Sequence, residues 1–210
     1  MFKNVVFDFD GVIINSHDNQ RKALKESYEQ IVGEGKPPYD AFFEQSGNSL
    51  SNIFNNLNLP LEMISIYNRI SLENIETIKL YEGIQELLDE LSYNRISCYL
   101  CTGKDRYRTT KILKKLKIKK YFDMINCSDD VQFPKPNPEG LTIIANKFNC
   151  EKPNMVMVGD AINDILAAKN FGISSIAVTW GDMKVNSLIN YAPNFIAHTV
   201  DELKKIILFS

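Results

Sequence analysis

Short apolar runs separated by longer segments restrict the fold of this chain more than any other feature. From residue 96 onward, the separating segments are long enough for helices, and residues 83–91 and 161–171 carry helical spacing of apolar side chains. Strands that alternate with helices form a parallel sheet with helices on both faces. The sequence therefore predicts an α/β fold built on a doubly wound, Rossmann-like parallel sheet. The predicted strands are 5–9, 96–101, 124–127, 155–158, 175–178 and 194–196.

One segment interrupts this alternation. Between residue 16 and about residue 79 the sequence shows helical periodicity, as in residues 23–31, and no convincing strand. We therefore expect a core domain made of residues 1–15 and 80–210. Residues 16–79 would form a small α-helical domain inserted after the first strand.

Composition excludes several classes of protein. Hydrophobic residues make up 44% and charged residues 24% of the 210, which is typical of a globular domain. The net charge of −2 does not favour a nucleic-acid partner. No apolar stretch approaches the roughly 20 residues needed to span a bilayer, and the amino terminus lacks the features of a signal peptide. We expect a cytoplasmic protein with no membrane partner and with its four cysteines reduced.

The first predicted strand delivers two carboxylates, Asp8 and Asp10, and stops at Gly11. Side chains two apart on a strand share a face, so both acids should emerge on one side at the carboxyl end. Two neighbouring like charges are costly unless a cation or a proton separates their roles. The pair is therefore a candidate for divalent-metal chemistry, nucleophilic chemistry or both.

Three further motifs lie where open α/β sheets place ligands. The strand at 96–101 ends in Thr102 and Gly103, a hydroxyl followed by a flexible backbone. Lys135 is held between two prolines. The strand at 155–158 ends in Gly-Asp160, and Asp164 follows about one helical turn later. Considered alone, Asp160 and Asp164 could simply be first-turn acids that complement a helix dipole.

Taken together, these four motifs resemble those of the haloacid dehalogenase superfamily, in particular the phosphoglycolate phosphatase and β-phosphoglucomutase branch. The resemblance spans residues 5–181. It implies a helical cap, formed by the inserted segment, that closes over the active site. It also implies a Mg²⁺-dependent hydrolase that acts on a small phosphorylated metabolite through an aspartyl-phosphate intermediate.

The resemblance assigns a role to each site residue. Asp8 would be the nucleophile and Asp10 the general acid and then the general base. Thr102 and Gly103 would bind the transferring phosphoryl group together with Lys135. The Mg²⁺ ligands would be Asp8, Asp160 and Asp10, the last through its backbone carbonyl. Asp164 would complete the metal shell or orient Lys135.

Two alternatives stay open. A sugar-phosphate mutase would use the same two acids, but β-phosphoglucomutases have a histidine ten residues after the second one, where this chain has Gln20. A non-catalytic phosphometabolite-binding module would have lost a catalytic or metal-binding residue, and none is missing here.

The sequence says less about the substrate. The predicted cap loop at 45–49 is uncharged and polar, which weakly favours hydroxyl-rich leaving groups over strongly anionic ones. Lys104 occupies a position that is often basic in related phosphatases. From Lys104 to Lys120 there are nine basic residues and one acid. The simplest interpretation of that segment is an amphipathic helix with a solvated basic face.

Overall fold

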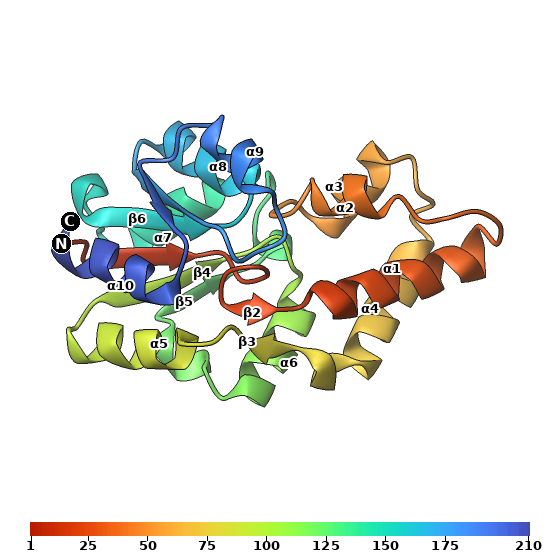
Figure 1. Ribbon diagram of the computed structural model, residues 1–210, viewed down its shortest axis with the longest axis horizontal. Coiled ribbons are helices and arrows are strands. Elements are labelled where there is room, and N and C mark those ends of the chain that lie inside the picture. The colour runs from red at the N-terminus through yellow and green to blue at the C-terminus, as the bar shows by residue number, and fades with distance from the viewer.

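The computed structural model describes all 210 residues, which form a sheet-centred core with a group of helices at one end (Figure 1). Both termini lie at the end of the core opposite to these helices. No helix combines the length and apolar character required to cross a bilayer. The strands are β1 (Asn4–Phe7), β2 (Ile14–Asn15), β3 (Lys79–Leu80), β4 (Ser97–Cys101), β5 (Met124–Asn126), β6 (Met155–Gly159), β7 (Ser174–Val178) and β8 (Phe195–Ala197).

Ten α-helices accompany these strands. They are α1 (His17–Ile31), α2 (Tyr39–Phe43), α3 (Leu50–Asn56), α4 (Met63–Glu73), α5 (Ile84–Tyr93), α6 (Arg106–Leu116), α7 (Glu139–Phe148), α8 (Ile162–Phe171), α9 (Val185–Ile189) and α10 (Val200–Phe209). Short 3₁₀ turns cover Ile75–Thr77, Lys119–Tyr121, Ser128–Asp130 and Lys152–Asn154.

The main sheet has six strands in the order β5-β4-β1-β6-β7-β8, and every neighbouring pair is parallel. This arrangement confirms the predicted doubly wound α/β core. All six predicted strands are present, within three residues of their expected ends. The strand order reverses at β1, so the loops after β4, β1 and β6 meet at one edge, where such sheets bind ligands.

Helices cover both faces of the sheet because side chains alternate along β1. Val5 and Phe7 belong to a large apolar cluster that includes residues of α5, α6 and α10. Val6 points the other way, into a cluster with residues of α7 and α8. Cys98 and Cys101 likewise lie in opposite clusters as free thiols, and burial raises their pKa to about 12 and about 11. They act as small core residues, as expected.

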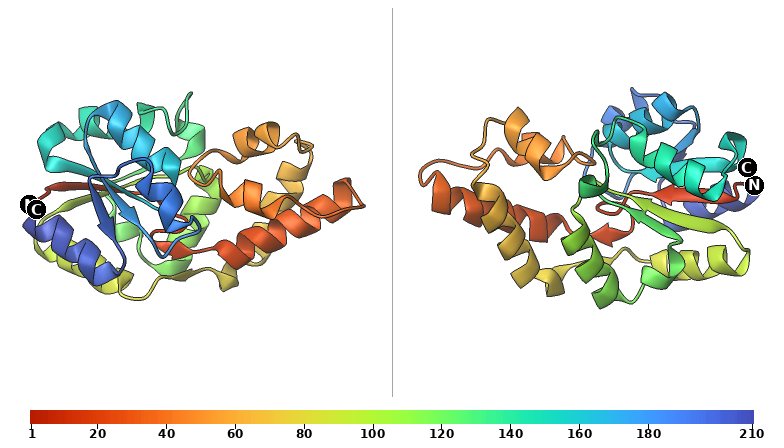
Figure 2. Two further views of the ribbon diagram at one scale, coloured as in Figure 1. Left: turned by 45° about the horizontal axis from the view of Figure 1, so that its top comes forward. Right: turned by 180° about the vertical axis from the view of Figure 1, so that it is seen from behind.

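The helices α1 to α4 have an apolar cluster of their own, in which Phe42, Phe54 and Tyr67 form edge-on or tilted aromatic pairs. Figure 2 shows these helices, in red-orange to yellow, standing beyond the carboxyl edge of the sheet. Two chain crossings join them to the core. There, the short strands β2 and β3 pair antiparallel. The domain boundaries at residues 15/16 and 79/80 stay a prediction.

The first strand is shorter than predicted. It ends at Phe7 instead of residue 9, so Asp8 and Asp10 belong to the following loop. Gly11 then turns the chain with a φ of +74°, a conformation that favours glycine. Strand alternation therefore does not govern the two acids, and they enter different surroundings.

Candidate active site

The candidate site lies at the carboxyl edge of the three central strands. Asp8 follows β1, Thr102 follows β4 and Asp160 follows β6. Because β1 pairs in parallel with both β4 and β6, the sheet itself brings these three positions together. Asp8, Asp10, Thr102 and Gly103 line one cleft between the core and the α1–α4 helices.

Three carboxylates form the centre of the site. Asp8, Asp160 and Asp164 each place one oxygen within 4.8 Å of the others, and all three are buried. The backbone packs tightly around this group: a Cβ on Gly11 would lie 2.1 Å from Asp160 Oδ2. The glycine after the two-acid motif therefore allows the loop to approach Asp160 as well as to turn.

Lys135 is the cation of this group, and the residue is 5% exposed. Its ammonium donates to Asp8 Oδ1 at 2.9 Å, to Asp164 Oδ1 at 2.5 Å and to the carbonyl of Cys101 at 2.9 Å. An ammonium has three protons, so the protein already uses all of them. This geometry fits a lysine that orients Asp8, whereas direct contact with substrate phosphate stays a prediction.

Burial and charge repulsion raise the pKa values of two of these acids, Asp8 and Asp160. Burial, followed by the charges of Asp164 and Asp10, raises the pKa of Asp8 to about 7, although Lys135 opposes the shift. Burial and the charges of Asp8, Asp164 and Asp182 raise the pKa of Asp160 well above its usual range. One ammonium does not compensate three neighbouring carboxylates. Without a further cation, the protein favours protonated acids here.

The group fits a divalent cation. Asp160 accepts a hydrogen bond from Asp182 N at 2.9 Å through Oδ2, while its buried Oδ1 has no partner. An unpaired buried carboxylate oxygen is costly. Magnesium prefers oxygen ligands of this kind, and Asp8 and Asp160 could supply them. Asp164 Oδ2 instead accepts from Ala161 N at 3.1 Å, and its other oxygen holds Lys135. Of its two expected roles, the geometry fits orientation of Lys135 better.

Asp10 has different surroundings. Its carboxylate lies outside the acidic group, so a metal could reach this residue only through its backbone, as the resemblance implies. Asp10 Oδ1 accepts from Ser16 Oγ at 2.5 Å and from Gln20 Nε2 at 3.4 Å, and it pairs with Lys104 Nζ at 3.2 Å. Its carboxylate is therefore held apart from Asp8, within the same cleft.

The loop at 45–49 closes the cleft from the helical side. Asn163 Nδ2, at the start of α8, donates to the carbonyl of Ser46 at 3.0 Å. A Cβ on Gly103 would lie 2.2 Å from the carbonyl oxygen of Asn48. Gly103 is therefore required for close approach of this loop. Thr102 is buried, and its Oγ1 accepts from Lys104 N at 3.2 Å, which leaves the hydroxyl proton available to a ligand.

Some site residues were missed from the sequence. Arg108 and Tyr67 also line the cleft. Arg108 lies four residues after Lys104, so a one-turn spacing on the predicted basic helix could have indicated it. Asp182 bonds to His17 Nδ1 at 2.7 Å, and His17 stacks on Phe43 at 4.2 Å between ring centres. No local pattern predicts a contact between residues 165 positions apart.

Comparison with known proteins is consistent with this geometry. The sequence model of haloacid dehalogenase-like hydrolases matches residues 5–178. The chain belongs to this family. It is 28% identical over 96% of its length to pyrophosphatase PpaX of Bacillus velezensis, covering 94% of that protein. It is 30% identical over 87% of its length to phosphoglycolate phosphatase of Vibrio parahaemolyticus, covering 68% of that protein.

Solved structures agree with these matches. A haloacid dehalogenase-like family hydrolase from Streptococcus pneumoniae superposes with a TM-score of 0.83 at 25% identity, covering all of this chain and 99% of the other. The crystal structure of a predicted phosphatase from Clostridium acetobutylicum superposes with a TM-score of 0.85 at 25% identity, with 99% of both chains covered. The family match and the phosphatase relatives make this chain a phosphatase of the haloacid dehalogenase family.

Proposed function

We propose that this phosphatase is a Mg²⁺-dependent phosphomonoester hydrolase that acts on a small phosphorylated metabolite through an aspartyl-phosphate on Asp8. One observation carries the proposal. Asp8 is 2% exposed, is oriented by Lys135, lies beside two further acids and faces a cleft that it shares with Asp10. A carboxylate in such a position can act as a nucleophile toward phosphorus.

The first step joins an Asp8 oxygen to phosphorus and breaks the bond between phosphorus and the leaving oxygen. Asp10 donates its proton to that oxygen, which departs as an alcohol. In the second step Asp10 takes a proton from water, whose oxygen attacks phosphorus and displaces the Asp8 carboxylate as phosphate forms. This division of roles requires an ionised Asp8, and a bound cation would favour that form by offsetting the burial that raises the pKa of Asp8.

The remaining groups bind and orient. Lys135 would hold Asp8 in place and offset its charge, while Thr102 Oγ1 and the Gly103 backbone N–H would receive the phosphoryl oxygens. Magnesium held by Asp8, Asp160 and the Asp10 carbonyl would neutralise charge on the phosphate when bound. The orphaned Asp160 Oδ1 and the raised pKa of Asp8 support this cofactor.

The site supports a hydrolase over a mutase. Gln20 Nε2 lies within 3.4 Å of Asp10 Oδ1 and 2.9 Å from Ser16 Oγ, so an uncharged amide stands where β-phosphoglucomutases have a titratable histidine. The pyrophosphatase and phosphoglycolate phosphatase relatives suggest pyrophosphate and phosphoglycolate as test substrates. Both are small, as the closed cleft requires. We also propose that the protein is located in the cytoplasm.

The experiment is phosphate release from a panel of phosphate esters and pyrophosphate, with Mg²⁺ and with a chelator. Asp8→Asn is the blank. Asp123→Asn is the matched control, because Asp123 is exposed and precedes β5, at the edge of the sheet opposite to the site. We expect release that requires Mg²⁺, is absent from Asp8→Asn and is retained by Asp123→Asn. Isomerised sugar phosphate with little release would favour the mutase. Substantial release by Asp8→Asn would disprove the mechanism.

A further inference from the structure

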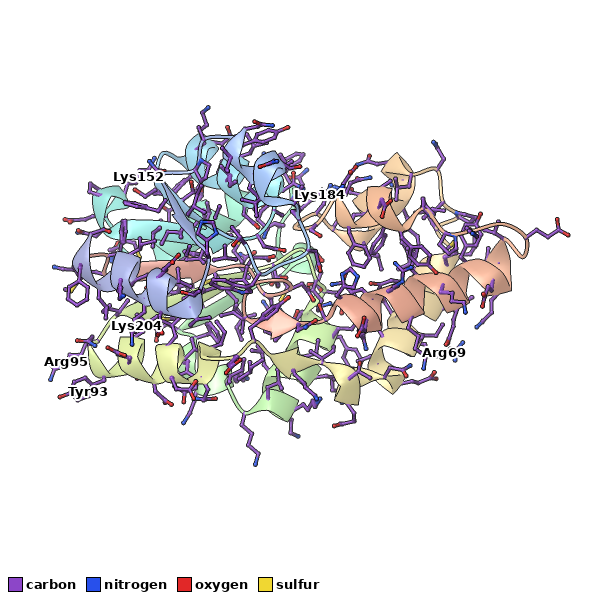
Figure 3. The ribbon with its side chains drawn as sticks, in the orientation of Figure 1. Arg69, Tyr93, Arg95, Lys152, Lys184 and Lys204 are labelled. Carbon is purple, nitrogen blue, oxygen red and sulfur yellow. The ribbon has the colours of Figure 1, made fainter.

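Two basic side chains are buried in the cleft, away from the acidic group. Lys104 is 6% exposed and Arg108 is 4% exposed, and both line the cleft that contains Asp8 and Asp10. Apart from Lys135 in the acidic group, no other basic residue is buried. Figure 3 shows Arg95, Lys152 and Lys204 on the outside of the core and Arg69 on the outside of the α1–α4 helices. A buried cation is costly unless it is paired, so this pair needs explanation.

Arg108 is fixed in place but not fully paired. Asp105 caps α6 and accepts a hydrogen bond from the Arg108 backbone N at 2.9 Å and another from its Nε. Of the two terminal guanidinium nitrogens, one is within reach of the Tyr67 phenol, and no other group of the protein accepts a hydrogen bond from them. The Cζ atom of Arg108 lies 5.4 Å from the ring centre of Tyr67, a buried residue of α4. The core thus holds one edge of the guanidinium, while the free edge lies at the cleft.

Lys104 lies on the leaving-group side of the site. Its ammonium is 3.2 Å from Asp10 Oδ1, and Asp10 is the group that would protonate the leaving oxygen. Once Asp10 carries that proton, Lys104 has no ionised partner. An anionic group on the leaving part of the substrate would give the Lys104 ammonium an ionised partner again. It would also accept hydrogen bonds from the Arg108 guanidinium.

The helical side of the cleft offers no competing charge. The cleft residues contributed by residues 16–79 are uncharged, including Ser46, Asn48 and Tyr67. Burial raises the pKa of Tyr67 strongly, so its phenol is neutral. The only acids lining the cleft are Asp8 and Asp10. The uncharged loop at 45–49 thus gives an incomplete picture of the leaving-group site, because its charge comes from α6 of the core.

We propose that Arg108 and Lys104 bind a second anionic group on the substrate, so that this enzyme prefers small phosphate compounds whose leaving group carries a carboxylate or a phosphate. This inference depends on the proposed hydrolase function for its catalytic meaning. Arg108 is the specificity-determining residue, because its fork of N–H donors matches the planar or tetrahedral oxygens of such a group. Lys104 adds charge next to the leaving oxygen.

The test compares three substrates that differ in the leaving group. The leaving group of phosphoglycolate carries a carboxylate, and that of pyrophosphate is itself a phosphate. Hydroxyethyl phosphate has an uncharged hydroxymethyl group in place of the carboxylate of phosphoglycolate. The wild type should show a higher kcat/KM for one or both anionic compounds than for hydroxyethyl phosphate. Arg108→Met should reduce that preference by about 10- to 100-fold, the usual range for hydrogen bonds to charged groups. The better anionic substrate distinguishes carboxylate from phosphate recognition.

Two further variants keep the result interpretable. Lys111→Met, an exposed position on the same helix, should retain the wild-type preference. Arg108→Lys keeps the charge but loses the fork, and it should recover part of the preference if Arg108→Met folds poorly. A wild-type preference for hydroxyethyl phosphate would overturn the inference, as would an equal loss on all three substrates in Arg108→Met.

If the wild type hydrolyses none of these three compounds, binding decides the inference, while the wider panel of phosphate esters decides the proposed function. Titration of phosphoglycolate and of pyrophosphate into the wild type and Arg108→Met would then be measured by calorimetry. Weaker binding of either anion by about 10-fold or more in the variant supports the second anion site. Equal affinity in both proteins, or no binding to either, rules it out.

Discussion

The core and the α1–α4 helices contribute to one cleft in different ways. The core supplies every charged group that faces it, including Asp8, Asp10, Lys104 and Arg108. The helices supply neutral side chains and the loop at 45–49, mounted on an aromatic cluster. On the proposed mechanism, chemistry and charge recognition thus belong to the sheet edge. The helical region would control access and shape.

This difference has an energetic basis. Buried carboxylates are costly, so they require surroundings that do not relax, and the ends of three paired strands provide them. A region that opens for substrate must leave its closed position at low cost. Its contacts with the core near the site include the hydrogen bond from Asn163 to Ser46. We expect substitutions in the core to affect the rate most, and substitutions at the contact to affect binding.

After the complete loss expected of Asp8→Asn, the largest effect should come from Asp10→Asn. Loss of general acid–base catalysis should lower kcat by roughly 10²- to 10⁴-fold, because the leaving oxygen must then depart without a proton. Steady-state kinetics over a range of pH would measure it. An unchanged pH–rate profile at a near-normal rate would mean that Asp10 is not the acid.

Lys135→Met tests how much the buried ammonium stabilises the acidic group. Removing this ammonium leaves Asp8 and Asp164 buried without their cation, which should lower the free energy of unfolding by about 3–5 kcal/mol. Lys204→Met is the matched control, since its partly exposed pair with Glu90 should contribute less than about 1 kcal/mol. Urea unfolding of both variants measures the difference. Equal losses would contradict the account of the acidic group.

Magnesium should stabilise the core in a pH-dependent way. The pKa of Asp8 is raised to about 7 in the folded protein, so folding retains a proton that the unfolded chain releases. Without metal, this contribution to stability is complete below the ordinary pKa of an aspartate and is lost as pH rises toward 7. Asp160 shifts in the same direction.

A bound cation replaces those protons. At 100 times Kd, Mg²⁺ should contribute about 2.7 kcal/mol, or roughly 5–10 °C in Tm. Thermal scans with Mg²⁺ and with chelator should give a larger difference at about pH 8 than at about pH 5. Asp160→Asn should remove most of it. A shift that is independent of pH, or that survives in Asp160→Asn, would place the metal elsewhere.

The smallest effect should come from the contact between the two regions. Asn163→Ala removes the hydrogen bond to Ser46, which is worth about 0.5–1.5 kcal/mol. If this bond holds the closed state, KM should rise by roughly 2- to 10-fold while single-turnover chemistry stays near normal. Asn170→Ala removes a hydrogen bond to the carbonyl of Pro136 on the exposed side of α8 and is the control. A change in chemistry with unchanged KM would show that Asn163 acts on the core.

The sequence predicted the core better than the cleft, for physical reasons. Strand ends are local features: apolar runs ending at Asp8, Thr102 and Asp160 predicted both the sheet and the positions that it brings together. The different surroundings of the Asp8 and Asp10 carboxylates could not be predicted. The strand stops at Phe7, and the packing of Gly11 against Asp160 determines the conformation of the loop that carries both acids.

The leaving-group side depends on contacts between distant segments. Arg108 meets Tyr67 only because α6 and α4 lie across the cleft from one another. The basic segment was interpreted as a solvated helix face, which holds for Lys111 and Lys114 but not for Arg108. Helical periodicity identifies a buried face. It does not show that a charged residue on that face points into a binding site.

The most direct test of the account is detection of the covalent intermediate. The wild type would be mixed with Mg²⁺ and its best substrate, quenched in acid within the first turnovers, digested and analysed by mass spectrometry. The account predicts one phosphoryl group on the peptide that contains Asp8, and none in Asp8→Asn. Phosphate release in the wild type with no phosphorylated peptide, or with the phosphoryl group on another residue, would contradict it.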